Sequence, residues 1–215
     1  MKIGILGTGV VGSTIGKKLV QLGNDVRMGS RSAGGEKAQA WVREAGKGAS
    51  EGTFADAAAH GEMVFNCTSG MASLDALKAA GAENLDGKIL VDVANPLDFS
   101  KGMPPTLSVC NTDSLGEQIQ RAFPRARVVK ALNTMNTSVM VQPSRVPGAH
   151  TAFICGNDAE AKTRVREILM SGFGWKDVID LGDIAGSRGQ EMILPLWLRL
   201  FMTLNNADIN FHVAR

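Results

Sequence analysis

The first residues with recognisable chemistry are glycines near the start of the chain, in the run Gly7-Thr8-Gly9-Val10-Val11-Gly12. The run matches G-x-G-x-x-G, which holds a dinucleotide when it follows a strand and opens a helix. The first glycine permits the tight turn, the second lets backbone N–H groups approach a pyrophosphate, and the third lets the helix pack closely on the strand. The helix N-terminus adds unsatisfied N–H donors and a partial positive charge. We therefore interpret all six residues as a dinucleotide-binding loop rather than as a glycine-rich turn without a ligand.

The end of the second expected strand indicates which dinucleotide is bound. Enzymes that use NAD usually carry Asp or Glu about 20 residues after the loop, to bind the ribose 2′-OH. Here Ser30 and Arg31 stand at that place, so a hydroxyl and a guanidinium replace the acid. These groups suit a 2′-phosphate, which offers charge and several acceptor oxygens. Lys37 and the hydroxyl of Thr8 are further candidate contacts, and we predict a preference for NADP(H) over NAD(H).

Small and amide side chains follow three later strands of the expected sheet. They lie in the segments 67–70, 94–97 and 131–136. Ligands of open α/β sheets bind outside the carboxyl ends of the strands, so the three segments should face one crevice. Their side chains suit a nicotinamide carboxamide and ribose, although each residue taken alone could equally be an ordinary loop cap.

The elements that must position these residues are alternating short strands and helices. Strands are expected over residues 2–6, 26–29, 48–53, 62–67, 88–93, 127–132, 151–155 and 175–181. Helices are expected over 11–22, 36–45, 57–59, 73–80, 114–123, 158–170 and 187–206, the last interrupted at Pro195. The alternation predicts a doubly wound, mostly parallel α/β sheet of the Rossmann-like type. We expect an NADP-binding domain over residues 1–186, with the helical segment 187–215 packing over the ligand face or against a dimer partner.

Composition argues against several other classes of protein. Lys and Arg number 23 against 21 Asp and Glu, a net charge of +2, which does not predict a nucleic-acid or membrane-surface partner. The three cysteines are far apart without a CxxC pattern, so we expect no disulfide framework, no metal site and a reducing, cytoplasmic location. We see no secretory signal, and no apolar run is long enough to span a bilayer.

On these motifs the chain resembles the NADP oxidoreductases that depend on coenzyme F420, a deazaflavin. The segments that carry the resemblance are 3–12, 29–31, 128–134, 154–158 and 191–206, so it extends over nearly the whole chain. The chain is also similar to the cytosolic NADPH-binding domain of membrane metalloreductases, which shares the glycine loop and the strand end at 130–133.

The resemblance implies hydride transfer between a nicotinamide and a deazaflavin stacked face to face. It implies that residues 8–11 hold the pyrophosphate, that Ser30, Arg31 and Lys37 hold the 2′-phosphate, and that the nicotinamide is surrounded by Thr68, Ser69, Asn95, Pro96, Ala131 and Asn133. Protein groups then mainly position two reactants, and we assign no side chain as a general acid or base.

The second substrate stays open. Archaeal members of the family often carry His where this chain has Asn133, and a glycine-rich tail where it has residues 205–211. Two other functions fit the same residues: an NADPH-dependent flavin or ferric reductase, and an NADP(H)-sensing module without turnover. A small-molecule redox acceptor is the expected partner of either enzyme.

The remaining candidates have ordinary structural interpretations. His60 and His150 are expected in solvated or turn positions, whereas His212 in the tail could reach the site. Lys130 and Asn133 form a K-x-x-N spacing used in hydroxyacid dehydrogenases, but residues three apart on a strand point to opposite faces. Cys67 is expected to be a small core residue.

The last expected helix has a broad apolar face. Leu194, Leu198 and Phe201 recur at helical spacing, more than a solvated helix would show. This face could line a slot for a flat ring system or form a homodimer interface.

Overall fold

The centre of the molecule is one eight-stranded sheet, in a computed structural model that describes all of residues 1–215. Its strand order is β10-β9-β8-β5-β4-β1-β2-β3. The strands are β1 Lys2–Leu6, β2 Asp25–Ser30, β3 Ala49–Thr53, β4 Met63–Asn66, β5 Ile89–Asp92, β8 Arg127–Ala131, β9 Ala152–Gly156 and β10 Val178–Asp180. Neighbouring strands run parallel except for the antiparallel pair β8 and β9. The predicted doubly wound, mostly parallel sheet is therefore confirmed.

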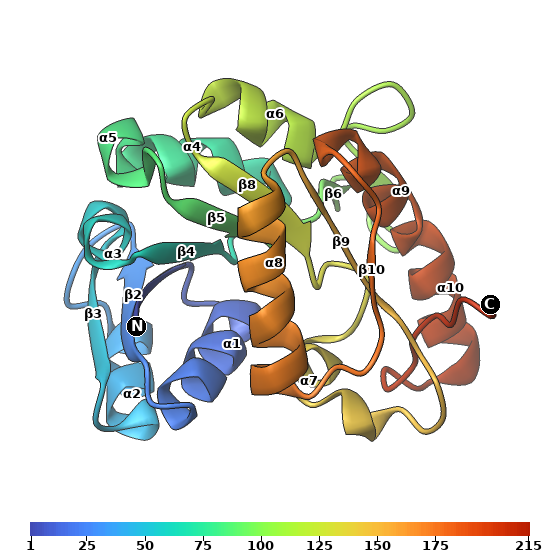
Figure 1. Cartoon of the computed structure of the whole chain (residues 1–215), viewed down its shortest axis with the longest axis horizontal. Coiled ribbons are helices and arrows are strands. Elements are labelled where there is room, and N and C mark those ends of the chain that lie inside the picture. The colour runs from blue at the N-terminus through green and yellow to red at the C-terminus, as the bar shows by residue number, and fades with distance from the viewer.

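Helices cover both faces of the sheet (Figure 1). They are α1 Val10–Gln21, α2 Glu36–Ala45, α3 Phe54–His60, α4 Gly70–Ala80, α5 Ala82–Leu85, α6 Leu115–Ala122, α7 Thr137–Val141, α8 Ala159–Glu167, α9 Ser187–Met192 and α10 Leu194–Leu204, with short helical turns η1 Pro143–Arg145, η2 Ile168–Phe173 and η3 Ile184–Gly186. One apolar core joins the sheet to α1, α2, α7 and α8, and a second joins its other face to α3, α4, α5 and α6. Because both faces are buried, the central strands are apolar along their length, as parallel strands are.

Local sequence signals set several helix starts. At α3, Thr53 and Asp56 form a capping box, and at α6 the side chain of Ser114 accepts from the backbone N–H of Glu117. Pro195 occupies the first turn of α10, where its missing N–H costs no hydrogen bond, so the expected interruption separates α9 from α10.

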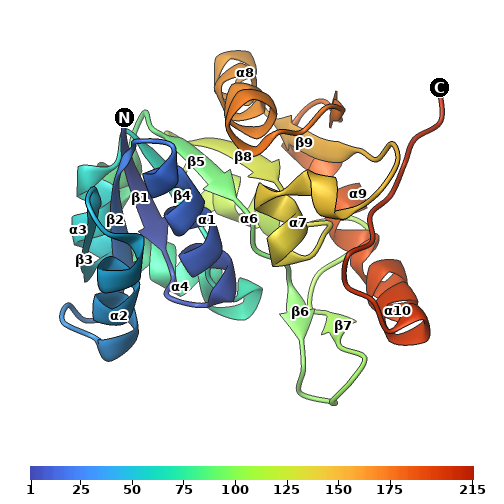
Figure 2. The ribbon, with the colours of Figure 1, turned by 90° about the horizontal axis from the view of Figure 1, so that it is seen from below.

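Two segments that lie between the expected strands and helices, 95–111 and 133–150, contain regular structure. The first carries the hairpin of β6 Leu97–Asp98 and β7 Thr106–Leu107, and the second carries α7 and η1. Strands of two residues and a helix of five are too short to show a hydrophobic period. Figure 2 shows the hairpin and α10 projecting together from one side of the sheet, beyond the ends of the central strands.

No helix in the structure combines the length and the apolar character that crossing a bilayer requires.

Candidate functional site

The glycine loop between β1 and α1 has a shape that requires two of its glycines, and the third leaves open space. Gly7 has φ +114°, and a Cβ there would lie 2.8 Å from the carbonyl oxygen of Cys67. A Cβ on Gly12 would collide with the carbonyl oxygen of Gly7, so this glycine is required for the helix to approach the strand. A Cβ on Gly9 would meet no atom within 4 Å, so the space in front of Gly9 is open. The open space at the second glycine is where the motif places a pyrophosphate.

The start of α1 has free capacity for an anion. Gly9 is its N-cap, no side chain caps the helix, and no acidic residue lies in its first turn. The first N–H groups of a helix have no partner within it and carry a partial positive charge. Val10, at the first helical position, is 74% exposed. The loop therefore presents unblocked backbone donors to its surroundings.

A cavity of about 670 Å³ lies against this loop and is called the glycine-loop cavity below. Its walls include Gly7, Thr8 and Gly9 on one side and Ser30 and Arg31 at the end of β2. The Arg31 side chain is exposed and forms no ion pair within the chain. The hydroxyl of Ser30 donates to the backbone oxygen of Ser32 at 2.6 Å, and its oxygen can still accept. A free guanidinium therefore lies at the rim of a cavity whose floor is a helix N-terminus.

A second cavity of about 380 Å³ adjoins the first and is called the α10 cavity below. The two share the wall made by Cys67, Thr68 and Ser69, which follow β4. Strand-end residues Asn95 and Asn133 also line the α10 cavity, as does Val11 of α1. The segment at the end of β4 therefore lies between the two cavities and forms part of the wall of each.

Asn95 and Asn133 hold each other at the ends of β5 and β8. The side-chain amide of Asn95 donates to the backbone oxygen of Asn133 at 2.8 Å, and that of Asn133 donates to Oδ1 of Asn95 at 2.9 Å. Between Asn133 and the buried Ala131, Leu132 has φ +63°, a conformation that is sterically costly for a residue with a branched side chain. Leu132 is itself buried, so its packing contacts hold the backbone in the turn that brings Asn133 to the cavity wall.

The structure brings most of the predicted site residues together. Gly7, Thr8, Gly9, Ser30, Arg31, Thr68 and Ser69 line the glycine-loop cavity, and Val11, Asn95 and Asn133 join Thr68 and Ser69 around the α10 cavity. Five predicted residues line neither cavity: Val10, Gly12, Lys37, Pro96 and Ala131. Ala131 belongs to the core of the sheet, Gly12 serves packing, and Lys37 is an exposed residue of α2.

Other candidates are placed away from the cavities. Lys130 is fully buried and lines neither cavity, so it does not act jointly with Asn133 at the cavity wall. His150 and His212 border a different cavity, beside Trp175 and the last residues of the chain. The expectation that His212 could reach the site is therefore wrong.

Sequence reasoning missed much of the α10 cavity. Phe99 of the β6–β7 hairpin, Met140 of α7 and Trp197 of α10 all contribute to its wall. The apolar face of the last helix pointed to Leu194 and Leu198, which do line the cavity. No local motif marks the other residues, because they come together only through the fold.

The α10 cavity holds almost no ionisable side chain. Cys67 is the one titratable residue in its wall, and burial together with the charge of Asp92 raises the pKa of that thiol well above its usual range. Cys67 is therefore a neutral thiol at neutral pH, neither an acid nor a nucleophile of any strength. The cavity can position and desolvate a ring system, but no side chain in its wall serves as a strong proton donor.

Comparisons with known proteins identify the family to which the chain belongs. The family model described as NADP oxidoreductase, coenzyme F420-dependent, matches residues 2–96. A crystal structure from Arthrobacter sp. FB24, described as a candidate F420-dependent NADP reductase, is 54% identical, covers all of both chains and superposes with a TM-score of 0.95.

Two further relatives are more distant. Metalloreductase STEAP3 of Rattus norvegicus is 32% identical over 209 residues; the match covers 91% of this chain but only 38% of that protein. A reductive aminase from Aspergillus terreus in complex with NADPH is 19% identical, covers 94% of this chain and 62% of the other, and has a TM-score of 0.68, a likeness of fold. Full-length identity of 54% to the Arthrobacter protein, together with the matching family model, shows that the chain belongs to the family of F420-dependent NADP oxidoreductases.

Proposed function

We propose that this protein transfers hydride between NADP(H), held in the glycine-loop cavity, and a flat redox acceptor of the deazaflavin type, coenzyme F420, held in the α10 cavity. The observation that carries the proposal is the wall of Thr68 and Ser69, which the two cavities share at the carboxyl end of β4. Two ligands on either side of one short segment would meet at its edge, as direct transfer between them requires.

The residues of the glycine-loop cavity fit NADP(H). The open space at Gly9 and the uncapped start of α1 suit the pyrophosphate, which their N–H groups would bind. Ser30 and Arg31 would bind the 2′-phosphate, because the guanidinium forms no ion pair within the chain and can supply its charge to the ligand. Lys37 is near in sequence and exposed, and we retain it as an outer contact of the same phosphate.

The α10 cavity suits the reacting rings. When bound, NADPH supplies a hydride from C4 of its nicotinamide to C5 of the deazaflavin. Asn95 and Asn133 would orient the nicotinamide end, since their paired amides fix each other at the wall. Leu194, Trp197 and Leu198 would cover the opposite side and exclude water. The proton that accompanies the hydride would come from solvent, because the wall offers no acid.

This absence of a strong acid favours ring acceptors over carbonyl or imine substrates. Reduction of a carbonyl or an imine places negative charge or basicity on one atom, which enzymes usually meet with a positioned proton donor. A flavin or a deazaflavin disperses the incoming electrons over a conjugated ring system. The neutral, largely apolar wall therefore suits the second group.

A second candidate function is reduction of a flavin or a ferric chelate by NADPH. The observation that favours it is the 32% identity to metalloreductase STEAP3, of which this chain spans 38%. A third candidate, an NADP(H)-sensing module without turnover, would bind the same dinucleotide and transfer no hydride.

We further propose that the protein acts as a homodimer in the cytoplasm. Helix α10 exposes Leu196, Met202 and Leu204, and only Leu194 among its residues is buried. Apolar side chains gathered on one exposed helix are typical of an interface. All three cysteines are free thiols, as in a reducing compartment. Sedimentation of the purified protein tests the dimer: a monomer at micromolar concentration would contradict it.

The enzymatic proposal is tested by mixing purified protein with NADPH and, in parallel, oxidised F420, flavin mononucleotide and a ferric chelate. We expect NADPH oxidation to be fastest with F420. Faster turnover with the flavin or the chelate would transfer the proposal to the second candidate. Tight NADPH binding without turnover on any acceptor would favour the sensor.

A further inference from the structure

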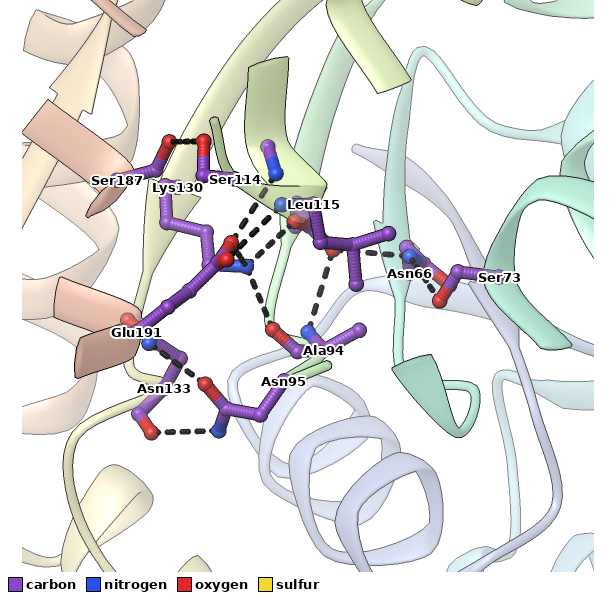
Figure 3. A network of polar contacts seen from close by, with 12 residues as sticks. Asn66, Ser73, Ala94, Asn95, Ser114, Leu115, Lys130, Asn133, Ser187 and Glu191 are labelled. Atoms are coloured by element: carbon purple, nitrogen blue, oxygen red, sulfur yellow. Dashed lines mark hydrogen bonds and ion pairs between the residues drawn. The ribbon is translucent and has the colours of Figure 1, made fainter. Parts of the chain in front are cut away.

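A buried cluster of charges lies between the sheet and α9 (Figure 3). The ammonium of Lys130 on β8 lies 2.8 Å from Oδ2 of Asp92 on β5 and 2.7 Å from Oε1 of Glu191 on α9. All three side chains are at most 1% exposed. Lys130 also donates to the backbone oxygen of Ala94 at 2.6 Å. The ion pairs therefore tie the C-terminal helices to the middle of the sheet.

Glu191 has a second set of partners. Its two carboxylate oxygens accept from the backbone N–H groups of Leu115 and Gly116 at 2.9 and 3.1 Å, at the start of α6. These donors, together with Lys130, satisfy a carboxylate that would otherwise be costly to bury. Burial lowers the pKa of Lys130, but the two carboxylates outweigh burial and hold its pKa above the usual value, so it stays charged.

Stability alone is a weak reason for such a cluster. Replacing a buried ion pair with well-packed apolar side chains is often neutral or stabilising, because the ions must be taken out of water. What an ion pair adds is a fixed geometry: α9 can dock in only one place without leaving a charge unpaired. The position of whatever follows α9 is then determined as well.

One end of the network reaches the wall shared by the two cavities. Nδ2 of Asn66 donates to Oδ1 of Asp92 at 2.9 Å, and the hydroxyl of Thr68 donates to Oδ1 of Asn66 at 2.6 Å. Thr68 lines both cavities. A continuous chain of polar contacts therefore joins Thr68 to Glu191.

The other end of the network leads to the opposite wall. Glu191, near the end of α9, is followed along the chain by Leu194, Trp197 and Leu198 of α10, which line the α10 cavity. The residue before it, Gln190, accepts through its backbone oxygen from the side-chain amide of Asn133 at 3.0 Å. The network thus spans the α10 cavity from the cofactor side to the side formed by α10.

Helix α10 is held at both of its ends. Leu194 at its start is its one buried residue. After its end, Asp208 pairs with Arg145 at 2.7 Å, and the backbone N–H of Thr151 donates to the carbonyl oxygen of Phe211 at 2.9 Å. The junction at Glu191 is the charged attachment that is buried before the start of α10.

We infer that Glu191 is a positioning residue which, through Lys130 and the start of α6, sets α10 against the cavity and so fixes the acceptor relative to the bound nicotinamide. The inference rests on the proposed function for the identity of the two ligands. Its structural part, that Glu191 determines the order of α10, is independent of which acceptor is used.

The test is Glu191→Gln, which keeps the length of the side chain and removes its charge. The matched control is Glu117→Gln on α6, because Glu117 pairs with Arg188 of α9 at 2.8 Å and joins the same two helices without touching Lys130. Measured quantities are the NADPH Kd from nicotinamide fluorescence, the KM for F420, and hydrogen exchange of residues 194–204, each in the full-length protein.

For Glu191→Gln we expect an NADPH Kd within about threefold of the parent protein, a KM for F420 raised about tenfold, and α10 exchange faster by about tenfold. Glu117→Gln should leave the NADPH Kd, the KM for F420 and the exchange of α10 within about twofold of the parent values, since its ion pair with Arg188 is partly exposed. An equal rise in Kd and KM, or unchanged exchange of α10 in Glu191→Gln, would overturn the inference.

Two outcomes separate the inference from its premises. If the parent protein reduces no acceptor, the proposed function is wrong, and hydrogen exchange with the NADPH Kd still decides the role of Glu191. If Glu191→Gln does not fold, Glu191→Asp is measured instead, because it keeps the charge but shortens the side chain. It should likewise raise the KM for F420 while leaving the NADPH Kd nearly unchanged. Loss of NADPH binding in both variants would make Glu191 a folding residue and overturn the inference.

Discussion

The two cavities of the site differ in the chemical groups that form their walls. The glycine-loop cavity is lined by the glycine loop before α1, by Ser30 and Arg31, and by residues of α4 that include three alanines. The α10 cavity is formed by apolar side chains such as Phe99 and Trp197, with paired amides at one wall and no charged group. The first suits recognition of phosphates by charge and N–H groups, and the second suits desolvation of a ring system.

The two cavities also differ in how their residues are held. Gly7, Gly9 and Gly12 lie within six positions of the chain, on a turn whose shape local sterics dictate. Phe99 and Trp197 are almost 100 positions apart, one on a short hairpin and one on a helix near the C-terminus. Substitutions should therefore separate cleanly into those that affect the nucleotide and those that affect the acceptor.

The largest expected effect is that of Gly9→Val. Because a Cβ at Gly9 meets no protein atom, the variant should fold, while its side chain fills the place of the pyrophosphate. We expect the affinities for NADPH and NADH both to fall by about 100-fold or more, equivalent to about 2.8 kcal/mol. Fluorescence titration measures the affinities, and an unchanged melting temperature excludes unfolding. Unchanged affinity for NADPH would contradict the proposal that the glycine-loop cavity binds the dinucleotide.

Arg31→Ala should separate the two dinucleotides. Loss of a charge-assisted hydrogen bond, about 1.5–3 kcal/mol, predicts a fall in NADPH affinity of about tenfold to 100-fold and little change for NADH. Arg43→Ala is the matched control, since Arg43 is an exposed arginine of α2 that lines neither cavity. Equal losses for NADPH and NADH would show that Arg31 does not read the 2′-phosphate.

Trp197→Ala should act on the acceptor alone. The indole lines the α10 cavity and stacks on Phe201 with ring centroids 5.7 Å apart. Removing it should raise the KM for F420 about tenfold and leave the NADPH Kd within about twofold, because only acceptor contacts are lost. Thr203→Ala, an exposed residue of the same helix, is the control. A parallel loss of NADPH affinity would show that the two cavities are not separable.

The smallest effect is expected at the surface pair of Asp208 and Arg145. The hydrogen bond from Arg145 lowers the pKa of Asp208 below its usual value. The pair therefore stabilises the fold above a pH of about 4, and this contribution is lost as the pH falls through the lowered pKa. Asp208→Asn should reduce the melting temperature by a few degrees at most at pH 7. The difference should shrink as the pH falls below about 4 and vanish once Asp208 is protonated in the folded protein, and a difference that does not depend on pH would assign the effect to packing.

The difference between the cavities also explains how far the sequence predicts the molecule. The strands at 2–6 and 127–132 and the helix at 36–45 follow from local signals, and the structure has them at or within one residue of the expected places. The glycine loop and the strand end at Ser30 depend on neighbours in sequence. Their grouping in one cavity was predictable because parallel strands end at the same edge.

The α10 cavity was predictable only in part. Met140, Phe99 and Trp197 carry no motif, and their meeting depends on how α7, the hairpin and α10 pack. One usable signal was overlooked. Asp92 and Lys130 each interrupt an otherwise apolar strand, and Glu191 begins an apolar stretch. Charges in such settings are rarely buried without a partner, so the three could have been paired.

The most direct test of the account is transfer of deuterium from NADPH labelled at C4 of the nicotinamide to F420, followed by mass spectrometry. Neighbouring cavities with a common wall predict direct transfer, so the deuterium should appear at C5 of the reduced deazaflavin and stay there in ordinary water. Deuterium released to water, or no reduction of F420 while NADPH is bound, would contradict the claim that the α10 cavity receives hydride from the glycine-loop cavity.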